Sequence, residues 1–335
     1  MNLKMHNCRC GLAAAAPENS LVARLRNSGQ NTSAIMNALE LHNVRKCYGD
    51  FVAVDDLSFQ IAPGQVYGLL GPNGAGKTST IRMMIGITLP DTGEIRMFGE
   101  RFKRAHLARV GYLPEERGLY RKMKLQEQLA LLGELKGLSA REAVRRTKSW
   151  CARLDLSDWL DRKVEDLSKG MQQKVQFIAA LLHDPDFIIM DEPFSGLDPA
   201  NAVLLKDVLV ELKRAGKTIL FSTHRMDQVE RLCDSICLIN RGKPVLEGEL
   251  RQIKARFGRH NIQLQYEGTN GFLDDTTLIQ SANDYGNYVE VRLQPGADAQ
   301  DLLKLAASGS RITRFEVMEP SLEEIFIDVV GKANA

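Results

Sequence analysis

The stretch GPNGAGKT, residues 71–78, constrains the fold of this chain more than any other part of the sequence. It follows an apolar run at residues 66–70 and precedes a predicted helix at residues 78–87, and it fits the pattern G-x-x-x-x-G-K-[ST]. In such a loop, backbone N–H groups surround phosphates and the next helix adds the positive end of its dipole. We therefore predict a phosphate site formed by Gly71, Pro72, Asn73, Gly74, Ala75, Gly76, Lys77 and Thr78. Lys77 would neutralise the β- and γ-phosphates, and the Thr78 hydroxyl would ligate Mg²⁺.

Two further apolar runs end in polar residues. FIIMDEP, residues 187–193, carries Asp191 and Glu192, and KTILFSTH, residues 217–224, ends in His224. Strands that are apolar throughout and alternate with helices predict a mostly parallel sheet, whose ligands bind at the carboxyl ends of the strands. There Asp191 could hold Mg²⁺ through water, Glu192 could polarise a water molecule, and His224 could donate a hydrogen bond to a γ-phosphate.

Composition excludes several other classes of protein. The chain has 335 residues, 44% of them hydrophobic, and its 44 Lys and Arg nearly balance 42 Asp and Glu. A net charge of +2 provides no broad basic field, which argues against nucleic acid as the main partner. The 6 cysteines form no CxxC pair, so a zinc site or a disulfide framework is not expected. No run approaches 18 apolar residues, so we expect that the chain does not cross a membrane by itself.

Changes in sequence pattern predict the domain boundaries. Residues 1–37 read as a disordered leader or an over-extended start, because Met36 directly precedes a well-patterned region. Residues 38–257 form one α/β domain, with a helical subdomain at about 115–182. Residues 258–335 predict a small α+β domain of ββαβα order, which closes on a helix with a capping box and an apolar stripe.

Residues 38–255 resemble the ATP-binding subunits of ABC transporters. The resemblance rests on an ordered set of motifs, KCYGD, GPNGAGKTST, GYLPEERGLY, LSKGMQQK, MDEP, SGLD and STH. It implies a P-loop ABC ATPase fold with a mixed, mostly parallel core sheet and a helical subdomain. It also implies that ATP and Mg²⁺ are the ligands of this domain.

The same resemblance assigns roles to individual residues. Tyr48 would stack on adenine, Ser79 would reach the α-phosphate, and Asp198 would lie at a dimer seam. Asp191 would serve Mg²⁺, Glu192 would be the catalytic base, and His224 would sense the γ-phosphate. Residues 71–78 would wrap the phosphates.

The chain departs from the family pattern at two places. Glu115 stands where the family usually has Gln, and it could either bind Mg²⁺ or contact the membrane partner. In LSKGM, Lys169 and Met171 replace a Gly and a Gln, whereas Ser168 and Gly170 are present. Because a helix N-terminus, a hydroxyl and a backbone N–H can still cover a γ-phosphate, we read this stretch as a half-site used in trans.

The implied function is an ATPase that powers transport. Two copies close around ATP, hydrolysis opens them, and a separate integral-membrane permease converts the motion into transport. The sequence is most similar to the branch that includes bacterial sodium-extruding and drug-exporting systems, which implies a peripheral position on the inner, cytoplasmic face of the plasma membrane. Sodium, a drug and a lipid remain alternative cargoes.

Two other classes of function compete with this one. A non-transport ABC ATPase acting on nucleic acid or ribosomes would need a long coiled-coil insertion or a second cassette, and the sequence has neither. A GTP-binding switch would need an N-K-x-D motif, which is also missing. The C-terminal domain has no catalytic constellation, and dimer contact or regulation is the role expected for it.

Overall fold

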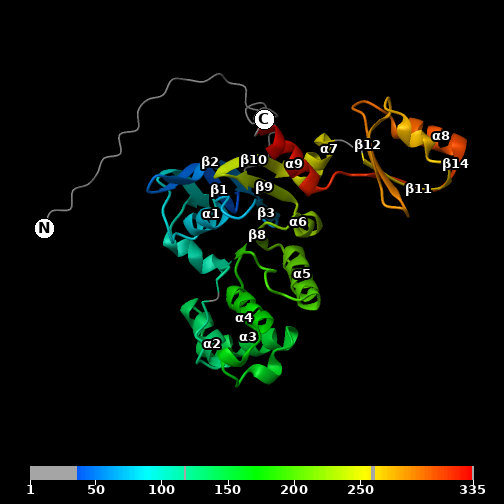
Figure 1. The fold of residues 1–335 in the computed structure, drawn as a ribbon. Coiled ribbons are helices and arrows are strands. Elements are labelled where there is room, and N and C mark those ends of the chain that lie inside the picture. The colour runs from blue at the N-terminus through cyan, green and yellow to red at the C-terminus, as the bar shows by residue number, and fades with distance from the viewer. Residues whose placement is uncertain (1–35, 117, 258–260, 334–335) are drawn as a thin grey trace. The chain divides into compact units, whose positions relative to one another are not determined.

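The computed structural model describes residues 36–116, 118–257 and 261–333 (Figure 1). The leader predicted over residues 1–37 therefore lies almost wholly outside the described residues. Within them, no helix combines the length and the apolar character that a bilayer span requires.

A six-stranded sheet forms the centre of the larger domain. Its strands lie in the order β10 (Lys243–Glu249), β9 (Ser235–Asn240), β3 (Val66–Leu70), β8 (Thr218–Thr223), β7 (Phe187–Asp191) and β6 (Val110–Leu113). Every neighbouring pair is parallel except β10 with β9. Strands β3, β7 and β8 are buried along their whole length, as expected for strands covered on both faces. The predicted mixed, mostly parallel sheet is thus confirmed.

A second, antiparallel sheet packs on the same core. Its order is β2 (Phe51–Ile61), β1 (Leu39–Tyr48), β4 (Thr92–Met97) and β5 (Glu100–Arg101). Buried side chains of β1 and β2 share one apolar cluster with β3 and with helix α1 (Lys77–Met84). Phe59 of β2 stacks on Tyr67 of β3 with ring centroids 5.1 Å apart. This contact packs β2 against β3, the strand that leads into the phosphate loop.

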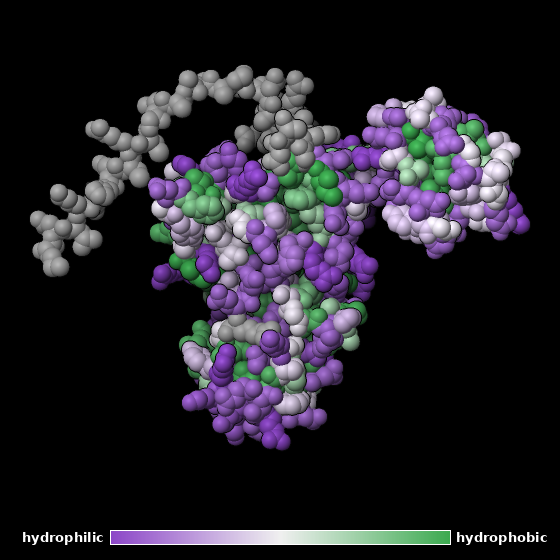
Figure 2. All heavy atoms as spheres, viewed as in Figure 1, coloured by the Kyte–Doolittle hydropathy of each residue, from purple (hydrophilic) through white to green (hydrophobic). Residues whose placement is uncertain are grey.

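Helices lie in the segment at about 115–182 where the sequence predicts a helical subdomain. The segment contains α2 (Leu125–Leu135), α3 (Ala140–Arg153) and α4 (Lys169–Leu181). Serine hydroxyls cap the last two helices: Ser139 accepts from the Glu142 N–H at 3.3 Å and Ser168 from the Met171 N–H at 3.2 Å. In the face shown in Figure 2, hydrophilic side chains cover most of this segment, with small apolar patches between them. The larger domain also contains the helices α5 (Pro199–Arg214), α6 (Met226–Leu232) and α7 (Leu250–Arg256).

The C-terminal region contains one strand more than the sequence predicted. Its antiparallel sheet has the order β12 (Ile279–Asp284), β13 (Val289–Leu293), β11 (Asn261–Gly268) and β14 (Ser310–Met318), with α8 (Ala299–Gly309) sharing its apolar core. The predicted ββαβα order is wrong because it omits β12. Only Ile279 of β12 is buried, so this edge strand has no alternation of apolar and polar residues to reveal it.

The last helix, α9 (Leu322–Ala333), packs on the larger domain. Its predicted capping box is present: the Ser321 N–H donates to Glu324 at 2.8 Å, and the Glu324 N–H donates to the Ser321 hydroxyl at 3.2 Å. Leu322 and Ile325 are buried in the same cluster as β3, β7 and β8. The Leu322 N–H also donates to the Glu230 carboxylate of α6 at 2.6 Å.

Candidate functional site

The glycine-rich loop joins the end of β3 to the start of α1, and two of its glycines are required by close packing. A Cβ on Gly71 would lie 2.1 Å from the Ile239 carbonyl oxygen, and a Cβ on Gly76 would lie 2.4 Å from the Ala53 carbonyl oxygen. Both glycines also have positive φ, 150° and 109°. Strands β9 and β2 therefore contact the loop backbone closely at these two glycines and restrict its conformation.

The start of α1 is open to an anion. No side chain caps the helix at Gly76, so its first N–H groups lack the usual protein partner. Pro72, Asn73 and Gly74 are exposed, whereas Ala75 is buried. This is the arrangement in which a helix N-terminus binds a phosphate group.

The Lys77 side chain folds back over the phosphate loop. Its ammonium donates to the carbonyl oxygens of Gly71 at 2.7 Å and Pro72 at 3.2 Å, and it lies 4.0 Å from Glu192. Burial lowers the pKa of Lys77, while the charges of Glu192, Asp191 and Glu115 oppose that shift. A phosphate group here would give the buried ammonium the countercharge that it otherwise has only at a distance.

Parallel pairing brings the polar strand ends together. In the β7–β8 register Asp191 lies opposite Ser222, and in the β3–β8 register Leu70 lies opposite Thr223. The carboxyl ends of three neighbouring strands therefore meet at the edge of the sheet where the phosphate loop begins. The sequence predicted this edge correctly from the polar residues that end each apolar run.

Asp191 is 1% exposed, and its two oxygens differ in their partners. Oδ1 accepts from the Ser222 hydroxyl, whereas Oδ2 is buried with no hydrogen-bond partner among the described residues. A buried carboxyl oxygen without a partner is costly unless a ligand satisfies it. A cation or its bound water would do so, and Mg²⁺ is usually held by one or two carboxylates together with phosphate oxygens and water.

Other residues predicted to hold the metal are placed less tightly. Thr78, the second residue of α1, is half-buried, and Glu115 is exposed. Within residues 36–116, 118–257 and 261–333, no group of three or more His, Cys, Asp or Glu side chains could hold a metal without other ligands.

Glu192 is fixed by several contacts in an unusual backbone conformation. Its φ is 48°, a left-handed value that is uncommon for a residue other than glycine. Oε1 accepts from the His224 N–H at 3.0 Å and contacts His224 Nδ1 at 2.8 Å, and Oε2 accepts from the Thr223 hydroxyl at 3.2 Å. These contacts fix the orientation of the Glu192 carboxylate beside Lys77 and hold the His224 imidazole against it.

The sequence did not predict the two residues that donate hydrogen bonds to Asp191 and Glu192. The hydroxyls of Ser222 and Thr223 donate to Asp191 and Glu192 from the end of β8. The available signal was their position, since both are polar residues inside an otherwise apolar strand that ends beside the acids. Buried hydroxyls of this kind need a partner.

Ser168, Gly170 and Asp198 gather around the N-termini of α4 and α5. Asp198 caps α5 through the Asn201 N–H at 2.9 Å, and a Cβ on Gly170 would lie 3.8 Å from the Asn201 side-chain nitrogen. Ser168 is exposed, and its hydroxyl caps α4. Among the described residues, no hydrogen bond joins this group to the phosphate loop of the same chain.

Two predicted nucleotide contacts lie at the rim of the loop. Tyr48 is the last residue of β1 and is 44% exposed. Ser79 is half-buried in the first turn of α1. Both positions leave polar or aromatic atoms available to a ligand.

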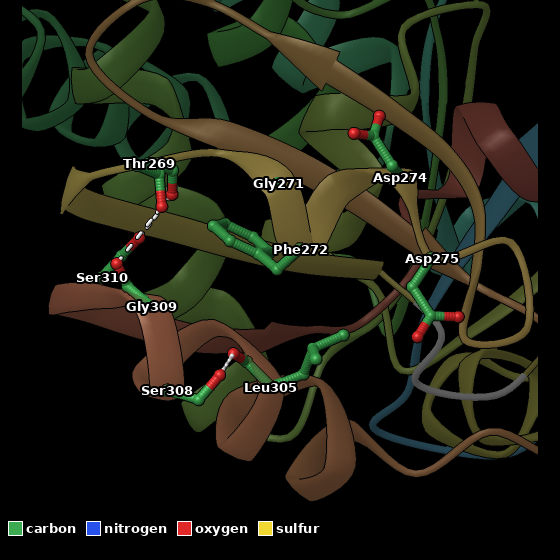
Figure 3. A pocket seen from close by; sticks show the side chains of 9 residues that line it. All are labelled: Thr269, Gly271, Phe272, Asp274, Asp275, Leu305, Ser308, Gly309 and Ser310. Carbon is green, nitrogen blue, oxygen red and sulfur yellow. Dashed lines mark hydrogen bonds between the residues drawn. The ribbon is translucent and has the colours of Figure 1, made fainter.

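The C-terminal domain has a hollow of its own, of about 460 Å³, lined by residues between 269 and 275 and between 305 and 310 (Figure 3). Its hydroxyls are already engaged: Thr269 donates to the Gly309 carbonyl at 3.3 Å and Ser308 to the Leu305 carbonyl at 2.7 Å. Asp275 accepts from the Thr277 N–H at 2.9 Å. These three side chains of the hollow thus already have partners within the domain.

Two family models match separate parts of the chain. The family described as "ABC transporter" matches residues 54–195, and the family described as "ATP-binding protein DrrA1-3-like, C-terminal domain" matches residues 248–330. The first match contains the phosphate loop and both strand-end acids. The second covers the small antiparallel sheet and most of α9.

Similar proteins and structures agree with these matches. An uncharacterized ABC transporter ATP-binding protein, YhaQ of Bacillus subtilis, is 44% identical over 293 residues, which is 88% of this chain and 98% of that protein. Nod factor export ATP-binding protein I of Cupriavidus metallidurans is 36% identical over 88% of this chain and 97% of its own length.

Among solved structures, an ATP-binding subunit of an ABC transporter is similar with a TM-score of 0.62 and 35% identity, over 66% of this chain and 93% of that one. A nucleotide-free ATP-binding cassette from an ABC transporter gives a TM-score of 0.57 and 28% identity. In its family, the ATPase domain binds ATP and hydrolyses it to power transport, and the subunits work with membrane permease partners. The chain belongs to the ATP-binding subunits of ABC transporters.

Proposed function

We propose that the strand-end site binds MgATP and hydrolyses its γ-phosphate, with Glu192 as the catalytic base. Support comes from the contacts to this carboxylate: Thr223 and His224 orient it, and Lys77 lies 4.0 Å away. His224 would hold Glu192 through Nδ1 and present its other ring nitrogen to the γ-phosphate or to the attacking water. Lys77 would exchange its bonds to the loop carbonyls for phosphate oxygens.

The other nucleotide contacts follow from their positions. The N–H groups of the 71–78 loop would surround the phosphates, Ser79 would reach the α-phosphate, and Tyr48 would stack on adenine. Asp191 and Thr78 would hold Mg²⁺, which when bound draws charge from the phosphate oxygens. Glu115 is a further candidate for the metal or for the permease, and its charge beside Lys77 supports a place near the phosphates.

We propose that the working ATPase is a homodimer in which each site is completed by the partner. Ser168, Gly170 and the N-terminus of α4 would cover the γ-phosphate bound by the other subunit, and Asp198 would lie at the seam. Support comes from the exposure of Ser168 and from the lack of a hydrogen bond between this group and the loop of its own chain, among the residues described.

The transport step would be export through a separate permease at the inner face of a bacterial plasma membrane. Support comes from the relatives whose names refer to Nod factor export and from the DrrA1-3-like C-terminal match. Residues 38–257 would form the ATPase domain, with the helical subdomain at about 115–182, and residues 258–335 the accessory domain. An ATPase acting on nucleic acid or ribosomes gains no support from these comparisons.

The orientation of Glu192 carries the proposal, and Glu192→Gln tests it. The amide keeps an oxygen for Thr223 and His224 but cannot take a proton, so we expect ATP binding to persist while kcat falls about 10²–10⁴-fold. Equilibrium binding of ATP and phosphate release by the complex with its permease would measure the two effects. Glu134→Gln, at an exposed position of α2, is the control and should keep full activity. Turnover of Glu192→Gln at the wild-type rate would remove Glu192 as the base.

A further inference from the structure

The strand that carries Tyr48 extends beyond one of its two neighbours. In the sheet order β2-β1-β4-β5, β1 lies between β2 and β4. Pairing with β4 ends where Arg45 lies opposite Thr92, the first residue of β4. Pairing with β2 continues to the end of the hairpin, where Tyr48 lies opposite Phe51. Residues 46–48 therefore have a strand on one side only.

The Asp91 carboxylate occupies the place where the missing strand would bond. Oδ2 accepts from the Cys47 N–H at 2.6 Å, and Oδ1 accepts from the Lys46 ammonium at 2.8 Å. The Asp91 N–H in turn donates to the Arg45 carbonyl at 2.8 Å. One acidic residue thus supplies the contacts that a further residue of β4 would otherwise make to the end of β1.

Charge strengthens these contacts. The bonds from Lys46 and from the Cys47 N–H lower the pKa of the Asp91 carboxyl, so it is ionised at neutral pH. The Lys46 side chain is only 15% exposed, although its partner is 44% exposed. Charge-assisted hydrogen bonds to a carboxylate are shorter and stronger than neutral ones.

Lys46 connects this clamp to the aromatic ring. Its ammonium lies over the Tyr48 ring, 5.6 Å from the centroid, within the range of a cation–π contact. Tyr48 is 44% exposed, so a packed core does not fix its ring. After Tyr48 the chain turns at Gly49, whose φ of 59° is left-handed. Asp91 therefore holds the Lys46 cation and the side of the strand end that β2 leaves open.

We infer that Asp91 is a positioning residue for nucleotide binding, which fixes the end of β1 and the Lys46 ammonium so that the Tyr48 ring is held ready to stack on the base. Asp91 itself would touch neither base nor phosphate. The inference rests on the proposed stacking of adenine on Tyr48. It predicts that removing the Asp91 carboxylate lowers the affinity contributed by the base and leaves the affinity for the phosphates unchanged, because the phosphate loop is built on β3 and α1.

Asp91→Ala tests this with two ligands in the full-length chain. Calorimetric titration would compare a non-hydrolysable ATP analogue with inorganic tripolyphosphate, which has no base. We expect Asp91→Ala to weaken binding of the analogue about three- to tenfold and Tyr48→Ala to weaken it roughly tenfold, since a base stacked on an aromatic ring contributes to affinity. Tripolyphosphate should bind all variants equally well.

Two further variants separate positioning from folding. Asp91→Asn keeps an oxygen for the Cys47 N–H and should recover part of the affinity. The double variant Tyr48→Ala with Asp91→Ala should bind the analogue no more weakly than Tyr48→Ala alone, because the effect passes through the ring. Glu94→Ala is the control: it removes an ion pair with Arg96 at 3.0 Å in the same strand and should change neither affinity.

The contrary outcomes are distinct. The positioning role would be overturned if Asp91→Ala weakened the binding of tripolyphosphate as much as that of the analogue. Additive losses of analogue affinity in the double variant would also overturn it. Normal binding by Asp91→Ala beside weak binding by Tyr48→Ala would overturn it while leaving the stacking proposal intact. Normal binding by Tyr48→Ala would overturn both.

Discussion

Gly71 is the residue of the phosphate loop that tolerates a side chain least. Its missing Cβ faces the Ile239 carbonyl at 2.1 Å, and a backbone carbonyl of a central strand cannot move aside cheaply. Gly74 lies in the same loop with φ of 79° and has no atom within 4 Å of its missing Cβ. The two glycines thus share a backbone requirement and differ in steric room.

Gly71→Ala should therefore lower stability by about 1–3 kcal/mol through overpacking and largely abolish ATP binding, since the loop must shift. Gly74→Ala should cost about 1 kcal/mol from backbone strain alone and retain measurable binding. Urea denaturation and ATP titration of the two variants would check this. Equal effects would mean that backbone strain, and not the Ile239 contact, dominates at Gly71.

At this scale the sequence predicted the charged residues and missed their supports. Lys77, Asp191, Glu192 and His224 were predicted because each ends an apolar strand or starts a helix. Thr223 was missed, as was Ser222, because a hydroxyl within a buried strand leaves no periodic signal. The left-handed φ of Glu192 was likewise unpredictable, because no local turn residue marks it.

Among the elements, helix α9 has one face buried against the larger domain and another face exposed to solvent. Leu322 is 3% exposed and packs in the core of the larger domain, whereas Ile327 on the same helix is 61% exposed. The apolar stripe predicted this helix, but the sequence could not predict which surface the stripe would cover. An apolar stripe specifies burial, and it does not specify the partner.

Leu322→Ala should lower the free energy of unfolding by about 2–4 kcal/mol, because it removes buried apolar atoms and leaves a cavity. Ile327→Ala removes a similar volume from an exposed position and should change stability by less than about 0.5 kcal/mol. Chemical denaturation followed by Trp fluorescence would measure both. Equal, small changes would show that α9 does not pack on the larger domain in solution.

At the scale of the whole molecule, the half-site proposed at Ser168 would need a second copy of the chain. The stretch LSKGM was predicted to act in trans, and within the chain Ser168 only caps α4. The proposed dimer follows from the sequence pattern, because the fold of one chain does not bring together residues that would meet across an interface.

Ser168→Arg should abolish ATPase activity while nucleotide binding to the isolated subunit stays within about twofold, because the lost cap is worth only about 1 kcal/mol. Ser139→Arg is the matched control: it removes the same kind of cap, on α3, and should keep activity. Phosphate release and ATP titration would measure the two properties.

Mixed dimers give a sharper form of the same test. Ser168→Arg keeps an intact phosphate loop, and Lys77→Ala keeps an intact Ser168, so a mixed dimer contains one complete site if the sites are shared. Recovery of activity on mixing two inactive variants is the expected result. Failure of every mixture, with both variants stable, would contradict the sharing of each site between two subunits.

The packing of α9 has a consequence for the order in which the protein matures. Leu322 and Ile325 complete a core whose strands end at Glu249, and the whole antiparallel sheet of the C-terminal domain lies between them in sequence. A chain growing on a ribosome therefore exposes an unfinished ATPase core until those two residues emerge. Newly made ATPase domains would remain open to chaperones during that interval, and the final helix would set the moment at which they become competent to assemble.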